Sequence, residues 1–543
     1  MKIIYFLFFL FVYTATFSQV EDAWVYFKDK RNSEAYLTTP STMLTQKAID
    51  RRIAQNIPFD ILDVPIEQSY INQITASIGV TVKAKSKWLN CAHVRGSLAN
   101  INALKLFSFV DHLDFANHAL NTAKIGTAKK TKNLPVNKTV ATAGNYDYGN
   151  SANQIQMLNG HLLHQLNYTG SGKVIAVLDS GFPNVNTAQP FQRLISNGLI
   201  LGGYDYVNKN SNFYTGNSHG TLVLSLMGGY KDGQLIGTAP DAKYYLYITE
   251  DNADENPVEE SYWVEAAEEA DRVGVDIITT SLGYFDYGPN YPAYSHTYSD
   301  MTGNVAFASQ GANIAFSKGI IVVASAGNEG NNPTEKHIGV PAEALNVIAV
   351  GAVKSDKTYA SFSSIGPSFD GRVKPDVMAQ GQNPYFSDTS GNIVNNSSGT
   401  SFSCPITAGL IACLWQALPT MTNKQIKELI IQSADKFSTP TNQLGYGIPD
   451  FNLAFANGLS IISFSESDLV IYPNPTKDLI KVNLPENSSP KKLYIYSVLG
   501  QKVLEKEVFN QSSNVTLKSL ENGVYFYKIE GYGFYKSGKI IKQ

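Results

Sequence analysis

The sequence predicts an α/β fold for the central part of this 543-residue chain. Four short apolar runs end in small or polar residues, as strands buried on both faces of a parallel sheet do: VIAVLD, DIITTSLG, GIIVVASAG and NVIAVGAV. Helix-like segments such as EESYWVEAAEEADRVG and GANIAFSKG separate these runs. This alternation predicts a parallel sheet with helices on both faces, and ligands of such sheets bind beyond the carboxyl ends of the strands.

The flanking segments have different patterns, and a chain of this length is expected to form more than one domain. Residues 19–121 alternate strand-like and helix-like runs in a βαββαβ-like order, which predicts a small α+β domain. Residues 467–543 hold three strand-like runs separated by turns, which predicts a small all-β sandwich.

Two segments predict processing of the chain. Residues 1–18 place Lys2 before an apolar run of about ten residues, which is typical of a signal peptide and shorter than the roughly 20 residues of a membrane-spanning helix. Residues 122–143 are rich in lysine and threonine and lack apolar periodicity, so we expect an exposed linker with a cleavage site. The chain is therefore expected to be exported and to carry no transmembrane anchor.

Composition excludes some classes of partner. The net charge of -3 and the pI near 6.3 give no reason to propose a nucleic acid or an anionic membrane. Of the three cysteines, Cys404 and Cys413 are expected on one helix, where a rise of about 1.5 Å per residue separates them by roughly 13 Å. A disulfide needs Cα atoms within about 7 Å, and Cys91 falls in another domain, so we expect no disulfides.

Three glycine-flanked motifs carry the chemistry: VLDSGF around Asp179, NSHGTLVLS around His219 and SSGTSFSCP around Ser401. A serine hydroxyl becomes a nucleophile when a base removes its proton, and histidine titrates near neutral pH. A carboxylate that holds the imidazole in the correct tautomer completes the set. Each motif alone is weak, but together they predict acyl transfer to a serine.

The chain order Asp, His, Ser is that of subtilisin, and residues 144–460 resemble the subtilisin-like serine peptidases (family S8). The resemblance implies a subtilisin-like fold and catalysis by Asp179, His219 and Ser401 through an acyl-enzyme, with no cofactor required for the chemistry. It also implies that Asn328, in ASAGNEG, and the N–H of Ser401 stabilise the oxyanion. Residues 19–121 are then an inhibitor-like propeptide; the alternative is an unrelated binding domain that stays attached.

The resemblance also indicates the substrate-binding residues. Ser281, Leu282 and Gly283 are expected along one side of the cleft, and Ser325, Ala326 and Gly327 form the other wall of the primary pocket. Small residues on that wall predict an open apolar pocket for a large side chain at P1, the residue whose carbonyl is attacked.

The acidic loop of residues 249–260, TEDNADENPVEE, has three interpretations. It favours basic substrates if it lies near the cleft, it binds calcium, or it is a solvated segment that caps a helix, which is the interpretation we prefer. Asp286 and Asp300 are other candidates for calcium, because relatives often carry structural calcium. No ligand loop is regular enough to name the metal-binding residues.

Position 402 departs from the family pattern. Many family members have methionine after the nucleophile, where this chain has Phe402. Oxidation of a thioether there would place a polar sulfoxide beside the oxyanion site. We therefore expect this chain to tolerate peroxide better than such relatives.

The C-terminal segment resembles a known sorting domain. Its YPNP, LGQ and NGVYFYKI motifs are similar to the C-terminal sorting domain of the type IX secretion system of Bacteroidetes; the alternative is a generic β-sandwich. The expected protein is a secreted or cell-surface serine endopeptidase made as a zymogen, with peptides and the type IX machinery as partners. Two alternatives stay open: an inactive binding protein on the same fold, and a maturation protease for one partner.

Overall fold

The computed structural model describes residues 20–121, 146–467, 470–483, 491–509, 513–531 and 534–543, and it forms two compact units that divide between Asn452 and Leu453. The predicted signal peptide lies outside the described residues, as does the predicted linker. The predicted domain boundaries stay predictions.

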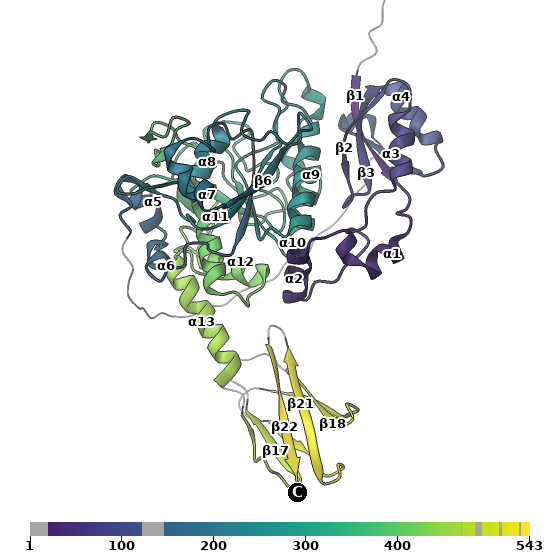
Figure 1. Ribbon diagram of the computed structural model, residues 1–543, viewed down its shortest axis with the longest axis vertical. Helices are drawn as coiled ribbons and strands as arrows, with labels where there is room; N and C mark the ends of the chain where they lie inside the picture. Colours follow the sequence, from purple (N-terminus) through teal and green to yellow (C-terminus); the bar gives the residue numbers. More distant parts are fainter. Residues whose placement is uncertain (1–19, 122–145, 468–469, 484–490, 510–512, 532–533) are drawn as a thin grey trace, which may run out of the picture. The chain divides into compact units, whose positions relative to one another are not determined.

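A seven-stranded parallel sheet forms the centre of the first unit (Figure 1). Its strand order is β13-β12-β11-β10-β5-β9-β6. The strands are β5 (Val174–Asp179), β6 (Ile200–Asp205), β9 (Lys243–Ile248), β10 (Ile277–Thr280), β11 (Ile321–Ser325), β12 (Ile348–Val353) and β13 (Val377–Gln380). Thr280 pairs with Leu178 on one side and with Ala324 on the other, so β5, β10 and β11 end at the same edge. The four predicted apolar runs are the innermost strands, and every residue of β5, β11 and β12 is buried.

Helices cover both faces of this sheet, as the alternation predicts. α9 (Val258–Val273) and α10 (Phe307–Ser317) pack on one face, and α8 (His219–Gly228) and α11 (Thr400–Ala417) pack on the other (Figure 1). Gly274 ends α9 with a φ of 84°, a left-handed conformation that glycine adopts without steric cost. The remaining helices are α5 (Ala152–Gln156), α6 (His161–Gln165), α7 (Gln192–Ser196), α12 (Asn423–Gln432) and α13 (Phe451–Ser467).

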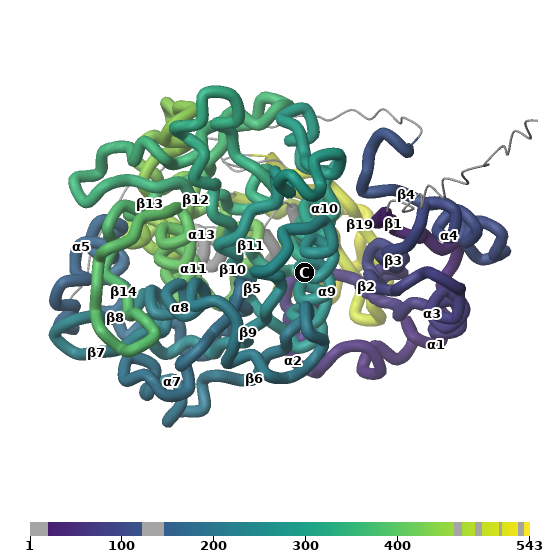
Figure 2. Tube along the Cα trace, turned by 90° about the horizontal axis from the view of Figure 1, so that it is seen from above, coloured from purple at the N-terminus to yellow at the C-terminus, as the bar shows by residue number. Residues whose placement is uncertain are grey.

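The N-terminal α+β region lies against α9 within the first unit (Figures 1 and 2). Its antiparallel sheet has the order β2-β3-β1-β4, formed by β1 (Val20–Phe27), β2 (Val80–Ser86), β3 (Cys91–Ser97) and β4 (Val110–Phe115). Its helices are α1 (Ser33–Thr38), α2 (Gln46–Ala54), α3 (Gln68–Thr75) and α4 (Leu98–Ala103). The predicted βαββαβ order is confirmed, with two additional helices after β1.

Polar contacts join this region to α9. Glu268 accepts hydrogen bonds from the Ser86 hydroxyl at 2.6 Å and from the Trp88 N–H at 2.9 Å. Trp24 donates its indole N–H to Ser261 at 2.9 Å. Apolar side chains such as Trp24 and Trp88 pack into the same core as Trp263 of α9, so the N-terminal region and α9 share both polar and apolar contacts.

The second unit is all-β apart from the helix that leads into it. Its two antiparallel sheets have the orders β16-β17-β20 and β19-β18-β21-β22. The strands are β16 (Val470–Tyr472), β17 (Leu479–Asn483), β18 (Lys491–Ser497), β19 (Lys502–Val508), β20 (Ser513–Thr516), β21 (Gly523–Gly531) and β22 (Phe534–Lys542). Alternate residues of these strands, such as Ile480, Leu493 and Val515, form one apolar core, as the sandwich prediction requires.

The three cysteines are buried thiols in the cores of their regions. Cys404 and Cys413 lie on α11, Cys91 lies on β3, and all three are free and buried. Among the residues that the structure describes, no helix is both long and apolar enough to cross a membrane.

Candidate active site

Asp179 and His219 form an ion pair at the carboxyl edge of the central sheet. Asp179 is the last residue of β5 and is fully buried, and His219 is the first residue of α8. The Nδ1 atom of His219 lies 2.8 Å from Oδ1 of Asp179, which also accepts the N–H of Ser180 at 2.8 Å. A Cβ on Gly220 would lie 2.4 Å from the carbonyl oxygen of Gly181, so only glycine at position 220 permits this close approach.

Opposing effects act on the pKa of His219. Burial lowers the pKa of this imidazole, but the Asp179 carboxylate and, more weakly, Glu250 raise it above its usual value. The Asp179 contact uses Nδ1, so Nε2 is the nitrogen left to act as a base.

Ser401 is the second residue of α11, in the first turn, where backbone N–H groups have no partner within the helix. Its hydroxyl donates to the carbonyl oxygen of Ser281 at 3.3 Å, and no hydrogen bond joins it to His219 among the described residues. Catalytic hydrogen bonds are often long in the absence of substrate and tighten when it binds.

Asn328 follows β11 and is held by the residue before the nucleophile. Its Oδ1 atom accepts the N–H of Thr400 at 2.9 Å and the Thr400 hydroxyl at 3.1 Å. Because the oxygen end of the amide is engaged, the Nδ2 end is left to donate to a substrate oxygen. Thr400 also accepts the N–H of Gly327 at 3.2 Å, which ties the two loops together.

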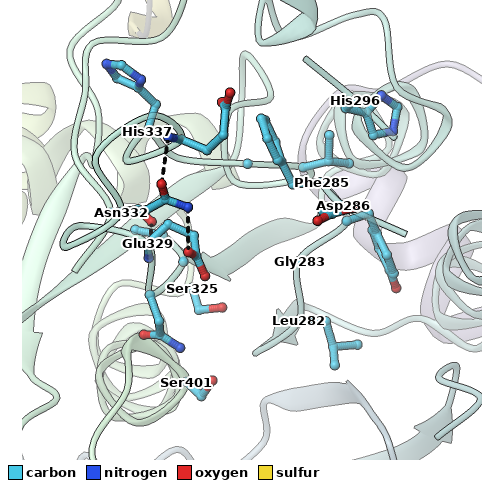
Figure 3. A pocket seen from close by; sticks show the side chains of 18 of the residues that line it. Leu282, Gly283, Phe285, Asp286, His296, Ser325, Glu329, Asn332, His337 and Ser401 are labelled. Atoms are coloured by element: carbon cyan, nitrogen blue, oxygen red, sulfur yellow. Dashed lines mark hydrogen bonds between the residues drawn. The ribbon is translucent and has the colours of Figure 1, made fainter. Parts of the chain in front are cut away.

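A cavity of about 530 Å³ lies beside Ser401 and contains all of the predicted substrate-binding residues (Figure 3). These are Ser281, Leu282, Gly283, Ser325, Ala326 and Gly327. Figure 3 shows two sides, one with Ser325, Glu329 and Asn332 and the other with Leu282, Phe285 and Asp286. The prediction of an apolar pocket is wrong, because the carboxylates Asp286, Glu329 and Glu335 also line it.

The prediction that the acidic loop is a solvated helix cap is also wrong for Glu259 and Glu260, whereas its other four carboxylates are half-buried or exposed. Glu259 and Glu260 are 0% and 1% exposed, and Tyr284 donates its hydroxyl to Glu250 at 2.6 Å. Burial and the neighbouring Glu255 raise the pKa of Glu250 to about 8, and burial with Glu250 raises the pKa of Glu259 to about 10. The loop also contacts the catalytic strand, because Asn252 donates to the carbonyl oxygen of Ser180 at 3.2 Å.

One carboxylate cluster in the described part of the chain fits a calcium ion. Oxygen atoms of Glu250, Glu255 and Glu259 lie within 4.8 Å of one another. Calcium prefers such oxygen ligands and tolerates irregular geometry. Neither of the other candidates, Asp286 and Asp300, belongs to this cluster.

The fold and this site define a class of protein, and comparison with known families agrees. Residues 170–447, slightly more than half of the chain, match the model of the subtilase family of S8 peptidases, so the chain belongs to that family. Residues 22–133 match the S8 propeptide domain of Bacteroidota, and residues 470–543 match a secretion system C-terminal sorting domain. The protein is therefore a secreted or cell-surface subtilase that carries a propeptide and a type IX sorting domain.

Individual relatives are similar over the central region. Subtilisin NAT from Bacillus subtilis subsp. natto is 32% identical over 282 residues, which are 52% of this chain and 65% of that relative. Subtilisin from Bacillus pumilus is 32% identical over 282 residues, which are 90% of its length. The solved structure of MycP1 from Mycobacterium smegmatis is 21% identical, with a TM-score of 0.44, over 60% of this chain and 89% of that one.

Sequence reasoning missed the residues that support the predicted ones. Ser180 fixes Asp179, and Thr400 fixes Asn328. The signal for Thr400 was present in the sequence, because it lies inside the motif around Ser401. No local signal indicates that Glu250 reaches the electrostatic surroundings of His219, since the two come from separate loops.

Proposed function

We propose that the chain is a serine endopeptidase, made as a zymogen, that hydrolyses peptide bonds with Asp179, His219 and Ser401. The observation that carries this proposal is the 2.8 Å pair of Asp179 and His219 at the same sheet edge as Ser401 and Asn328. A buried carboxylate, a histidine with one nitrogen free and a hydroxyl at a helix N-terminus are the parts that acyl transfer requires.

The reaction proceeds in two stages. His219 accepts the proton of the Ser401 hydroxyl through Nε2 as the oxygen attacks the carbonyl carbon of the substrate. The Nδ2 atom of Asn328 and the N–H of Ser401 donate hydrogen bonds to the oxyanion, and His219 then protonates the leaving amine. Water, deprotonated by His219, attacks the acyl-enzyme and releases the second product, which restores the Ser401 hydroxyl.

These steps use side chains, one backbone N–H group and water, so we infer that the chemistry requires no cofactor. Structural calcium stays a prediction of the sequence, with Glu250, Glu255 and Glu259 as the ligands that fit it. Calcium bound there should raise the melting temperature of the wild type more than that of Glu259→Gln, and more at pH 9 than at pH 6, because ionised carboxylates bind it. Equal responses of the two proteins would contradict this assignment.

The propeptide, the sorting domain and the substrate complete the proposal. We infer that the N-terminal domain assists folding and inhibits the enzyme until the segment of residues 122–143 is cut. We also infer that the type IX machinery recognises the C-terminal domain, and that proteins or peptides are the substrates.

The test compares the wild type with Ser401→Ala, using intact mass over time, casein cleavage and labelling by a fluorophosphonate. We expect the wild type to lose its N-terminal domain, to be labelled and to cleave casein, while Ser401→Ala stays whole and unlabelled. If processed wild type is neither labelled nor active on casein, the protein is an inactive binding module on a peptidase fold. Cleavage of one partner protein but not of casein would instead favour a maturation protease.

A further inference from the structure

We propose that the cavity beside Ser401 selects substrates with arginine or lysine at P1. This inference rests on the proposed function and adds a substrate class to it. The P1 side chain enters the cavity because the attacked carbonyl must lie between Ser401 and Asn328, both of which line it.

Three carboxylates line this cavity: Asp286, Glu329 and Glu335. Among the described residues that line the cavity, none is a lysine or an arginine, and no described cation lies within ion-pair distance of the three carboxylates. A cleft lined by one sign of charge concentrates the opposite charge. The lining therefore attracts cationic side chains and repels acidic ones.

The two histidines of the lining do not neutralise this charge. His296 is hydrogen-bonded to the buried carboxylate of Glu260 at 2.7 Å, so a proton on its ring is matched by that partner. Burial and the neighbouring Lys336 lower the pKa of His337, which is therefore neutral at pH 7. The carboxylates keep their net charge for the substrate.

Two of the carboxylates are held in place on opposite sides of the cavity. Asp286 accepts the N–H of Gly288 at 2.8 Å and the Ser295 hydroxyl at 3.2 Å, both on Oδ1, which leaves Oδ2 for a substrate cation. Glu329 is tied to Asn332, whose amide donates to it at 3.4 Å. Figure 3 shows Glu329 and Asp286 facing the cavity from its two sides.

Apolar side chains of the lining suit the aliphatic stem of a long basic side chain. Leu282 and Phe285 line one side, and Gly339 leaves open the space beside Phe285. A Cβ built on Gly339 would lie 3.5 Å from the Cβ of Phe285, so a larger side chain there would fill the slot. A cavity lined by apolar side chains and by carboxylates matches the methylene chain and the charged end of arginine and lysine.

The experiment uses processed full-length enzyme whose active concentration is titrated with a fluorophosphonate. Peptides that differ only at P1, with Arg, Lys, Phe, Leu or Glu, are compared by kcat/KM at low and high salt. We expect Arg and Lys to exceed Phe and Leu by about tenfold or more at low salt, Glu to be cleaved worst, and the difference to shrink as salt screens the charges.

Variants assign the selectivity to the named carboxylates. Asp286→Asn and Glu335→Gln should each lower the Arg-to-Phe ratio by about two- to fivefold, and the double variant should lower it further. Asp232→Asn removes one carboxylate that does not line the cavity and should keep the wild-type ratio. A preference for Phe or Leu in labelled enzyme, or an Arg-to-Phe ratio that no cavity variant changes, would overturn the inference alone. Absence of labelling and of all cleavage would overturn the proposed function with it.

Discussion

A fully buried arginine in the propeptide offers a direct test of how the propeptide is held. Arg52, on α2, is 0% exposed, and its guanidinium pairs with Asp63 of the propeptide at 3.0 Å and with Asp271 of α9 at 2.8 Å. Lys318 of the peptidase domain pairs with the same Asp63 at 3.2 Å. The network crosses from one domain to the other, and Arg52→Met removes its central charge while it keeps an apolar side chain of similar length.

The expected magnitude follows from what the substitution leaves behind. Removing one partner of a buried ion pair costs about 3–5 kcal/mol when the remaining charge is uncompensated. Here Asp63 keeps Lys318, and Asp271 keeps Arg51, so the remaining charges are partly compensated. We therefore expect the association of the propeptide to weaken by about 2–4 kcal/mol, which corresponds to roughly 30- to 700-fold in the dissociation constant.

The assay uses the Ser401→Ala protein, which the proposed mechanism predicts cannot process itself. Trypsin cuts the lysine-rich segment of residues 122–143, and the nicked complex is diluted and separated by size to find the concentration at which the propeptide dissociates. Arg31→Met is the matched control, because Arg31 lies over the ring of Tyr70 within the propeptide. If Arg52→Met dissociates at the same concentration as the control, the network does not hold the two domains together.

Three further predictions concern the reaction. Asp179 raises the pKa of His219 against the effect of burial, and the neutral imidazole is the active form, so kcat/KM should rise with pH through a value above 6.5. Asp179→Asn should reduce the rate and move this inflection to lower pH, and an unmoved inflection would contradict the role of Asp179. Thr400→Val removes the hydroxyl that donates a hydrogen bond to Asn328 at 3.1 Å and should lower kcat by about two- to tenfold, with KM nearly constant. A change confined to KM would refute a role of Thr400 in holding the oxyanion donor. Phe402→Met should lose activity in dilute peroxide faster than the wild type, which has a buried phenylalanine at that position, and equal rates of loss would count against this explanation.

The fold could be predicted because its periodic signals are strong and local. The runs that form β5 and β11 are continuous apolar segments rich in β-branched residues, a pattern typical of strands buried on both faces. The alternation in β18 predicted a sheet with one face in a core, which the buried Leu493 and Ile495 bear out. No comparable signal marks β13, since VMAQ is too short to be told from a buried turn of helix.

The site residues that lie within a local sequence motif could be predicted. Those that come together from distant segments of the chain could not. Asp179, His219 and Ser401 each lie in a motif that the reaction itself requires, so their sequence contexts identify them. The charge of the cavity depends instead on Asp286 and Glu335, which come from separate loops. The burial of Glu259 was missed because its carboxylate accepts backbone N–H groups of Asp251 and Asn256 in the preceding loop, a fold-back that no local pattern marks.

The contacts between α9 and the propeptide bear on how the propeptide is released. The helix carries Glu268 and Asp271, and the propeptide supplies donors to both: Ser86 and Trp88 to the first, Arg52 to the second. Acid should not easily break the ion-pair network of Arg52, Asp63 and Lys318. Burial raises the pKa of Asp63, but Arg52 and Lys318 lower it by more, so the pKa lies below its usual value. The stability that Asp63 contributes is therefore present above its unfolded pKa near 3.8 and is lost only as pH falls through the still lower folded pKa. We therefore propose that release at neutral pH depends on the cut expected within residues 122–143 and on dilution after export. The dissociation constant measured with Arg52→Met then bears directly on activation.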